Sequence, residues 1–170
     1  MEKLPTLEDS QIKFVVLRSC LSVPEVTYLM RTTIPSPSTL VSWQDFNGYQ
    51  KDALCRILGS NLGDAAWLQA QLPLSAGGMG LRGAFFHASS AYLGSVLLSE
   101  SLLQAILPNI GNSEQSLNLD AALVHFSKSV GELEVLTSDQ ISNEKQRSLS
   151  ARVDSHLLQK LHNETTKRQR

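Results

Sequence analysis

Apolar and polar residues follow a helical period along most of this chain. Apolar side chains recur three or four positions apart, which is typical of amphipathic helices that bury one face. The pattern predicts a mainly α-helical bundle of about six helices, over residues 6–23, 25–32, 38–58, 84–107, 117–130 and from 138 onward. The helix over 84–107 is strongly apolar and contains many small residues, so we expect it to be the central helix.

The last predicted helix carries a stripe of four apolar residues. Thr137 and Gln140 have the order of a capping box, which predicts a helix start near residue 138. The apolar residues that follow are spaced four positions apart, so they share one face and are expected to pack on the body of the protein. They are Leu149, Val153, Leu157 and Leu161.

One stretch departs from the helical pattern, because residues 71–84 hold four of the ten glycines. A proline interrupts a short apolar run there, and two adjacent glycines supply the positive φ that a chain reversal needs. We therefore predict a short β-hairpin near residues 68–82. A Gly-Gly-x-Gly sequence also resembles a phosphate-binding loop, but the lysine of such loops is missing, so a tight turn is the simpler interpretation. The residues of this structural motif are Pro73, Gly77, Gly78 and Gly80.

The order of these segments resembles the region downstream of the catalytic palm in non-long-terminal-repeat (LINE-type) retrotransposon reverse transcriptases. The resemblance rests first on QLPLSAGGMGLRGAFFHASSAYLGS, where a Leu-Pro, a Gly-Gly-x-Gly-hydrophobic-Arg and an alanine-rich helix follow one another. Two earlier segments resemble the approach to that motif, namely FVVLRSCLSVPEVTYLMRTTIP and LCRILGSNLGDAAWLQAQLP. At the end of the chain, KQRSLSARVDSHLLQKLHNETTKRQR resembles the start of a later helical region of these proteins. The resemblance covers nearly the whole chain and implies the thumb and the helices after it.

The resemblance also implies what this chain does not do. Polymerases of this family hold two metal ions with paired aspartates on a palm hairpin, and no Asp-Asp pair occurs in these residues. The resemblance therefore implies a non-catalytic fragment of a reverse-transcriptase-like protein. In the parent protein, such a region would support the template–primer duplex beside the palm.

Other enzyme classes are not indicated by any motif. The sequence has no G-x-S-x-G nucleophile elbow and no HExxH helix. His87 and His125 stand alone, and six positions separate His156 from His162, which puts them on opposed sides of a helix. We predict no catalytic residue, no metal site and no cofactor.

Charge provides one local signal for a partner. Lysine and arginine total 15 against 16 aspartate and glutamate, so the net charge of −1 gives no overall attraction to nucleic acid. Residues 145–170 hold seven basic and two acidic residues, a local net charge of +5. This imbalance is compatible with RNA or DNA binding, and equally with an ordinary solvated helix, which is the simpler interpretation. The candidates for nucleic-acid contact are Arg82, Lys145, Arg147, Arg152 and Lys160.

A protein partner is the alternative to nucleic acid. The apolar helix over 84–107 or the C-terminal helix could bind a helical partner, which would make the chain a protein-interaction module without nucleic-acid binding. Trp67 is interpreted as a core anchor, because no cluster of aromatic and basic residues surrounds it in the sequence as in base-stacking proteins.

Turn-forming residues between 108 and 116 mark the best internal boundary. They divide a helical thumb-like region with the hairpin, 1–110, from a C-terminal helical extension with a basic tail, 111–170, although both can belong to one continuous domain. The longest apolar runs are shorter than a membrane helix, so no membrane partner is expected. Cys20 and Cys55 have no CxxC spacing and no secretory signal precedes them, which predicts reduced core cysteines of an intracellular protein.

Overall fold

The computed structural model describes residues 7–106, 113–142 and 144–168. These residues are mainly helical, which confirms the predicted fold class. Their α-helices are α1 (Ser10–Cys20), α2 (Val23–Thr32), α3 (Pro37–Leu58), α4 (Asp64–Gln71), α5 (Ala84–Ile106), α6 (Ser113–Val130), α7 (Ser138–Ile141) and α8 (Gln146–Arg168). A single 3-10 turn, η2 (Leu74–Ala76), follows α4.

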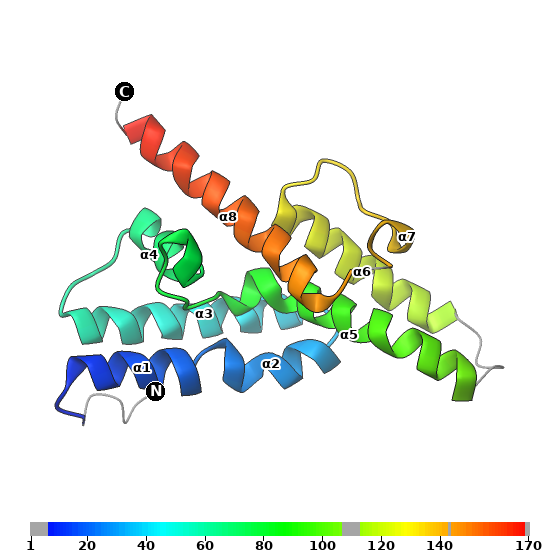
Figure 1. Cartoon of the computed structure of the whole chain (residues 1–170), viewed down its shortest axis with the longest axis horizontal. Helices are drawn as coiled ribbons and strands as arrows, with labels where there is room; N and C mark the ends of the chain where they lie inside the picture. Colours follow the sequence, from blue (N-terminus) through cyan, green and yellow to red (C-terminus); the bar gives the residue numbers. More distant parts are fainter. Residues whose placement is uncertain (1–6, 107–112, 143, 169–170) are drawn as a thin grey trace.

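Helix α5 is the centre of the arrangement, as predicted. It packs against α2 and α3 on one side and against α6 and α8 on the other. Figure 1 shows α1 and α2 along one edge of the molecule, beside α3, while α8 crosses the bundle obliquely and ends away from α6. Because α5 contacts helices from both ends of the sequence, it holds the bundle together.

Three clusters of buried hydrophobic residues form the core of the described chain. The largest, which we call the main cluster, brings together the five helices from α4 through α8. It consists of Leu68, Leu72, Leu93, Ala122, Leu123, Phe126, Ile141, Leu149, Val153 and Leu157. A second joins α1, α3 and α4 through Leu17, Ala53, Leu54, Ala70 and Leu81, with Trp67 packed against it. A third joins α2, α3 and α5. Trp67, predicted to be a core anchor, packs against the second cluster but is only partly buried.

Local capping explains where the helices begin and end. Asp9 caps α1 by accepting hydrogen bonds from the backbone N–H groups of Gln11 (2.6 Å) and Ile12 (3.0 Å). Ser36 caps α3, so this helix begins one residue before the predicted position. Helix α6 begins at residue 113 instead of 117, and the turn predicted between 108 and 116 lies partly outside the described residues.

The β-hairpin predicted near residues 68–82 is wrong, since the described residues contain no strand there. The first predicted strand instead belongs to α4, which Asp64 starts and whose alanines and glutamines favour a helix. The chain does reverse, but the returning residues donate backbone hydrogen bonds to the end of that helix: Met79 and Leu81 to the Ala70 carbonyl, and Gly80 to the Leu72 carbonyl. The reversal therefore caps a helix and builds no sheet.

The positive φ predicted for the two adjacent glycines is confirmed at Gly77 and wrong at Gly78. Gly77 and Gly80 have positive φ angles of 76° and 74°, while the φ of Gly78 is not positive. At Gly78 the reason for glycine is space, because a Cβ there would lie 2.0 Å from the Leu72 carbonyl oxygen. Pro73 precedes η2 and has φ −63°.

The last predicted helix is interrupted. The capping box at Thr137 exists, since the Thr137 N–H donates to Gln140 Oε1 at 2.8 Å, but it starts only the single turn α7. The long helix α8 begins separately at residue 146. Its apolar stripe packs on the body as predicted, with Leu149, Val153 and Leu157 fully buried and Leu161 half-buried.

The prediction that both cysteines lie in the core is wrong. Cys20 is exposed and Cys55 is partly buried, and both are free thiols. Cys20 is the last residue of α1 and faces away from the packed side.

Candidate nucleic-acid interface

Three of the five predicted basic residues line one surface hollow, which we call the basic hollow. It has a volume of about 570 Å³ and lies between α5 and the start of α8. Its lining consists of Arg82, Leu98, Lys145, Gln146, Arg147 and Ser150. The fold thus brings Arg82 beside residues that lie more than sixty positions later in the sequence.

The start of α8 positions two of these cations. The Ser148 N–H donates to the Lys145 carbonyl at 2.8 Å, and the Ser148 hydroxyl donates to Glu144 Oε2 at 2.6 Å, so the first turn is held from both sides. Lys145 and Arg147 are exposed, and neither takes part in an ion pair within the described ranges. The free N–H groups at the amino end of a long helix add positive potential. The hollow is therefore suited to an anion.

Arg82 has a structural partner. Its guanidinium lies 2.5 Å from Asp154 Oδ2, and the two side chains are 41% and 10% exposed. A carboxylate this deeply buried needs an opposite charge, so Arg82 first neutralises Asp154. Part of its guanidinium remains accessible at the hollow.

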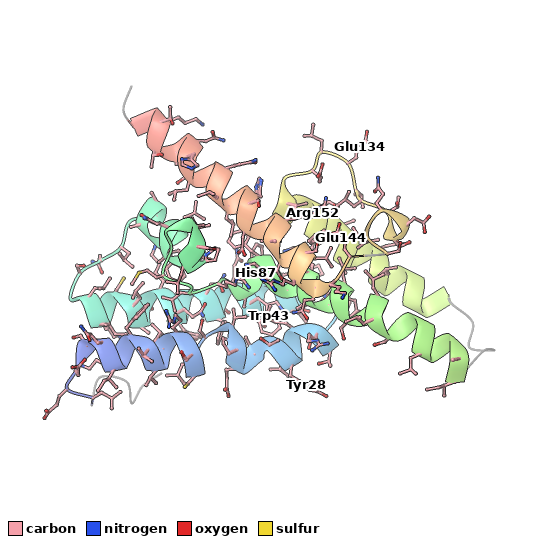
Figure 2. All side chains as sticks on the ribbon, in the orientation of Figure 1. Tyr28, Trp43, His87, Glu134, Glu144 and Arg152 are labelled. Atoms are coloured by element: carbon pink, nitrogen blue, oxygen red, sulfur yellow. The ribbon has the colours of Figure 1, made fainter. Side chains whose placement is uncertain are left out.

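His87 lies beside this pair, near the centre of the molecule (Figure 2). Its Nε2 is 3.3 Å from Asp154 Oδ1, but the geometry is not that of a hydrogen bond, and both ring nitrogens lack a hydrogen-bond partner in the part of the chain that the structure describes. His87 is 3% exposed, so it is a packed residue of the interior.

Arg152 lies elsewhere and is neutralised. It donates to Glu144 Oε1 at 2.9 Å and to Glu132 Oε1 at 3.4 Å, and its guanidinium carbon is 5.6 Å from the centre of the Phe126 ring. The contacts with Phe126 and Glu132 tie α8 to α6 and to the loop after it. Arg152 therefore contributes little free positive charge to a nucleic-acid surface.

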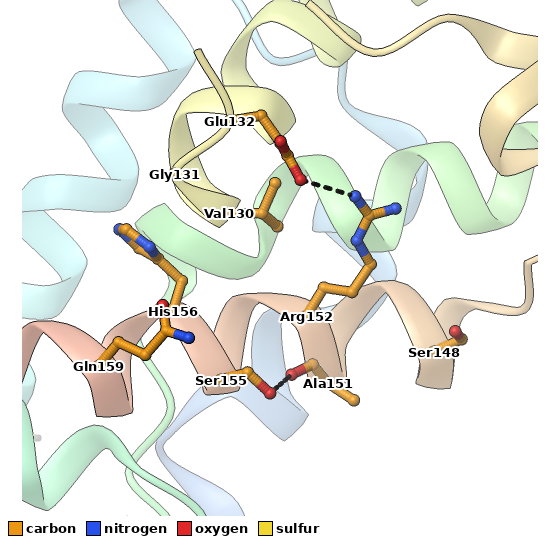
Figure 3. Close-up of a pocket in the computed structure, with 9 residues that line it drawn as sticks. All are labelled: Val130, Gly131, Glu132, Ser148, Ala151, Arg152, Ser155, His156 and Gln159. Carbon is orange, nitrogen blue, oxygen red and sulfur yellow. Dashed lines mark hydrogen bonds and ion pairs between the residues drawn. The ribbon is translucent and has the colours of Figure 1, made fainter. Parts of the chain in front are cut away.

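Figure 3 shows the second hollow, of about 540 Å³, in which Arg152 and Glu132 face each other between the end of α6 and α8. Gly131 ends α6 with a φ of 75°, and a Cβ on it would lie 2.3 Å from His156 Cε1. Glycine is thus required here both for its backbone angle and for the closeness of the imidazole. The paired charges leave this hollow without a dominant sign.

Lys160 lines a third hollow, which we call the aromatic hollow. Its volume is about 350 Å³, and its lining comes from α3, α4, α5 and α8: Gln44, Asn47, Gly48, Lys51, Asp64, Trp67, Leu68, Gln71, Phe85, Phe86, Lys160 and Glu164. The sequence did not predict this hollow, because its lining residues come from four separate helices and form no local motif. The only signal was Trp67, which we had assigned to the core alone.

His125 is a buried neutral imidazole. Its Nδ1 lies 2.7 Å from the Ser89 hydroxyl, and its ring meets Phe85 edge to face at 5.0 Å. Burial, followed by the positive charge of Lys128, lowers the pKa of His125 from 6.5 to about 4. Both side chains are buried, so the Ser89–His125 contact holds α5 to α6.

The low pKa of His125 should make the protein less stable in mild acid. The unfolded chain takes up a proton near pH 6.5 and the folded chain only near pH 4, so the stability present above pH 6.5 is lost as the pH falls through this window. We expect a loss of roughly 2–3 kcal/mol from this group between pH 7 and pH 4.5, since one pKa unit corresponds to about 1.4 kcal/mol. Urea unfolding at the two pH values measures it.

His125→Gln should remove that part of the pH dependence, whatever its effect at pH 7. His162 is exposed on α8, so His162→Gln is the matched control and should keep the wild-type dependence. An identical loss of stability on acidification in wild type and His125→Gln would show that other groups cause it.

Metal and membrane sites are not indicated in the described part of the chain. Its residues include no group of three or more histidine, cysteine, aspartate or glutamate side chains that could hold an ion. None of its helices is both long enough and apolar enough to cross a bilayer.

The five predicted nucleic-acid candidates are therefore divided among three places. Arg82, Lys145 and Arg147 share the basic hollow, Arg152 is paired in the second hollow, and Lys160 borders the aromatic hollow. Comparison of the chain with protein-family models, with curated proteins and with solved structures finds no match.

Proposed function

We propose that this chain is a non-catalytic helical part of a reverse-transcriptase-like protein and that it contacts the phosphate backbone of a template–primer duplex through the basic hollow. One observation carries the proposal: Arg82, Lys145 and Arg147, from two separate regions of the sequence, line the same hollow at the amino end of α8. The resemblance of the sequence to the thumb region supplies the kind of nucleic acid.

The chemistry of the hollow suits backbone contact. Phosphate contacts fix a protein on a duplex without reading its sequence, and they come from lysine and arginine side chains and from helix amino ends. Within the described residues, Lys145 and Arg147 supply two exposed charges that have no ion-pair partner. Since the whole chain has a net charge of −1, the attraction is local to this surface.

Salt dependence tests this function. If Lys145 and Arg147 each contact one phosphate, the affinity for an RNA–DNA hybrid should fall roughly tenfold when the salt concentration rises from about 50 to about 200 mM. The reason is that each contact releases counterions from the nucleic acid. Fluorescence anisotropy with a labelled hybrid measures the affinity at both concentrations.

A pair of double variants separates the hollow from overall charge. Lys145→Gln with Arg147→Gln removes the two free charges of the hollow and should leave almost no salt dependence. Lys13→Gln with Arg31→Gln removes the same charge from α1 and α2 and should bind like the wild type. Equal losses in the two double variants, or binding indifferent to salt in the wild type, would reject the proposal.

The alternative, a helical protein-interaction module without nucleic-acid binding, is favoured by one observation. Leu98, Leu102 and Ile106 lie four positions apart on α5 and are 58%, 62% and 63% exposed. Such a stripe fits the apolar face of a partner helix. Apolar pairing does not weaken with salt, so the same titration distinguishes the two functions. Leu102→Ser should abolish the pairing and leave hybrid binding unchanged.

A further inference from the structure

The aromatic hollow combines flat ring surfaces with buried amides. Trp67 on α4 and Phe85 and Phe86 on α5 contribute the rings, and Asn47 on α3 and Gln71 on α4 contribute the amides. Its volume of about 350 Å³ is within the range of small-molecule sites, which are typically apolar cavities with a few convergent polar groups.

Gln71 has a buried acceptor with nothing to accept. The residue is 3% exposed, and its Oε1 has no hydrogen-bond partner among the residues that the structure describes, while its Nε2 donates to the Trp67 carbonyl at 3.4 Å. A buried carbonyl oxygen without a donor destabilises a fold, and such atoms are rare. A bound molecule that donates a hydrogen bond would account for it.

Asn47 presents the complementary group. Its Oδ1 accepts a hydrogen bond from the Ala84 N–H at 2.7 Å, which fixes the amide and leaves Nδ2 as a donor. Gly83 makes room for both amides: a Cβ there would lie 2.2 Å from Gln71 Oε1 and 3.0 Å from Asn47 Nδ2. One acceptor and one donor therefore lie beside Gly83, next to the ring of Phe86, which lines the hollow.

We propose that the aromatic hollow binds a nucleobase, which stacks on Trp67 and hydrogen-bonds to Gln71 Oε1 and Asn47 Nδ2. Each nucleobase carries a donor and an acceptor side by side on its pairing edge, and aromatic side chains stack on its face. A neutral ring also suits the charges of the lining, because Lys51 pairs with Asp64 at 3.3 Å and Lys160 is accompanied by Glu164.

The base can belong to a free nucleoside or to a nucleic-acid strand. The two sources share the ring and its edge and differ in phosphate, for which exposed Lys160 is the available cation at this hollow. The basic hollow is lined by a separate set of residues. The site is therefore independent of the proposed duplex contact, and nucleosides, which have no phosphate, test it separately.

Isothermal titration calorimetry with adenosine, guanosine, cytidine and uridine is the first experiment. We expect saturable binding of at least one of the four to the whole chain, with quenching of the Trp67 fluorescence. Gln71→Met keeps the size of the side chain and removes the amide, so it should weaken binding about tenfold. Gln159→Met replaces an exposed glutamine of α8 outside the hollow and should bind like the wild type.

Two results would overturn the proposal: no binding of any of the four nucleosides to the wild type, or undiminished binding to Gln71→Met. Gln71→Met should fold at least as well as the wild type, because it removes an unpaired buried oxygen. Should it fail to fold, Trp67→Leu serves as the second variant, with a weakening of about tenfold from lost stacking. Undiminished binding to folded Trp67→Leu would equally reject the site.

A single-stranded trinucleotide distinguishes the two sources. If a strand is the ligand, the trinucleotide binds more tightly than the best nucleoside, and Lys160→Gln removes only that gain. If the free nucleoside is the ligand, the two bind equally and Lys160→Gln changes neither. Either pattern supports the base site and assigns its source.

Discussion

Replacing Leu157 with alanine should lower the free energy of unfolding by about 2–5 kcal/mol, the range for removing a buried leucine side chain without collapse of the cavity. Leu157 is fully buried in the main cluster, where α8 meets α4 and α6. Its neighbours come from several helices, so they cannot close around the cavity by moving one side chain. Urea denaturation followed by circular dichroism measures the change.

Leu133 is the matched control, because it is fully exposed in the loop between α6 and α7. Leu133→Ala should change stability by no more than about 0.5 kcal/mol, as for ordinary surface substitutions. Sedimentation of the wild type and of Leu157→Ala should give the same molecular mass, since the stripe of α8 packs within the chain. A mutant of wild-type stability would contradict the burial of Leu157.

The sequence was sufficient for elements whose determinants are local. The predicted helix over 84–107 corresponds to α5, and 38–58 corresponds to α3, because periodic apolar residues define both and a nearby cap at Ser36 starts α3. The stripe of α8 was also readable, since four-residue spacing fixes which residues share a face. These parts of the fold need no knowledge of distant contacts.

The turn around Gly78 was not readable in the same way. Glycines beside a proline predict a reversal, but not what the returning chain will meet. Here it meets the carboxyl end of α4, whose Ala70 and Leu72 carbonyls accept its N–H groups. A hairpin and a helix cap satisfy the same backbone groups, so local sequence did not distinguish them.

The candidate site was readable only as a list of charges. A basic segment does not reveal which of its cations have carboxylate partners, and the partner of Arg82 is Asp154, 72 positions away. A straight helix also spreads its basic residues, which puts Arg147 and Lys160 at different hollows. The aromatic hollow needs four helices in their final positions, so it has no sequence signature.

Gly78→Ala should lower the free energy of unfolding by about 3 kcal/mol or more, at the upper end of the range for overpacking. The added Cβ would lie 2.0 Å from the Leu72 carbonyl oxygen and 2.4 Å from its carbonyl carbon. Neither atom can move alone, since the same oxygen accepts the Gly80 N–H at 2.9 Å and the Leu72 side chain is fully buried in the main cluster. The substitution therefore strains the turn and the core together.

Two other glycines serve as controls that distinguish the steric clash at Gly78 from the strain of a positive φ angle. Gly77 has open space around it but a φ of 76°, so Gly77→Ala should cost only about 1–2 kcal/mol, the strain of a left-handed residue. Gly48 lies inside α3 with nothing within 4 Å, so Gly48→Ala should stabilise the protein by roughly 0.5–1 kcal/mol. Urea midpoints in the order Gly48→Ala, wild type, Gly77→Ala, Gly78→Ala are expected. If Gly78→Ala were as stable as Gly77→Ala, the returning chain would not lie against Leu72, and the packing of this turn on α4 would be wrong.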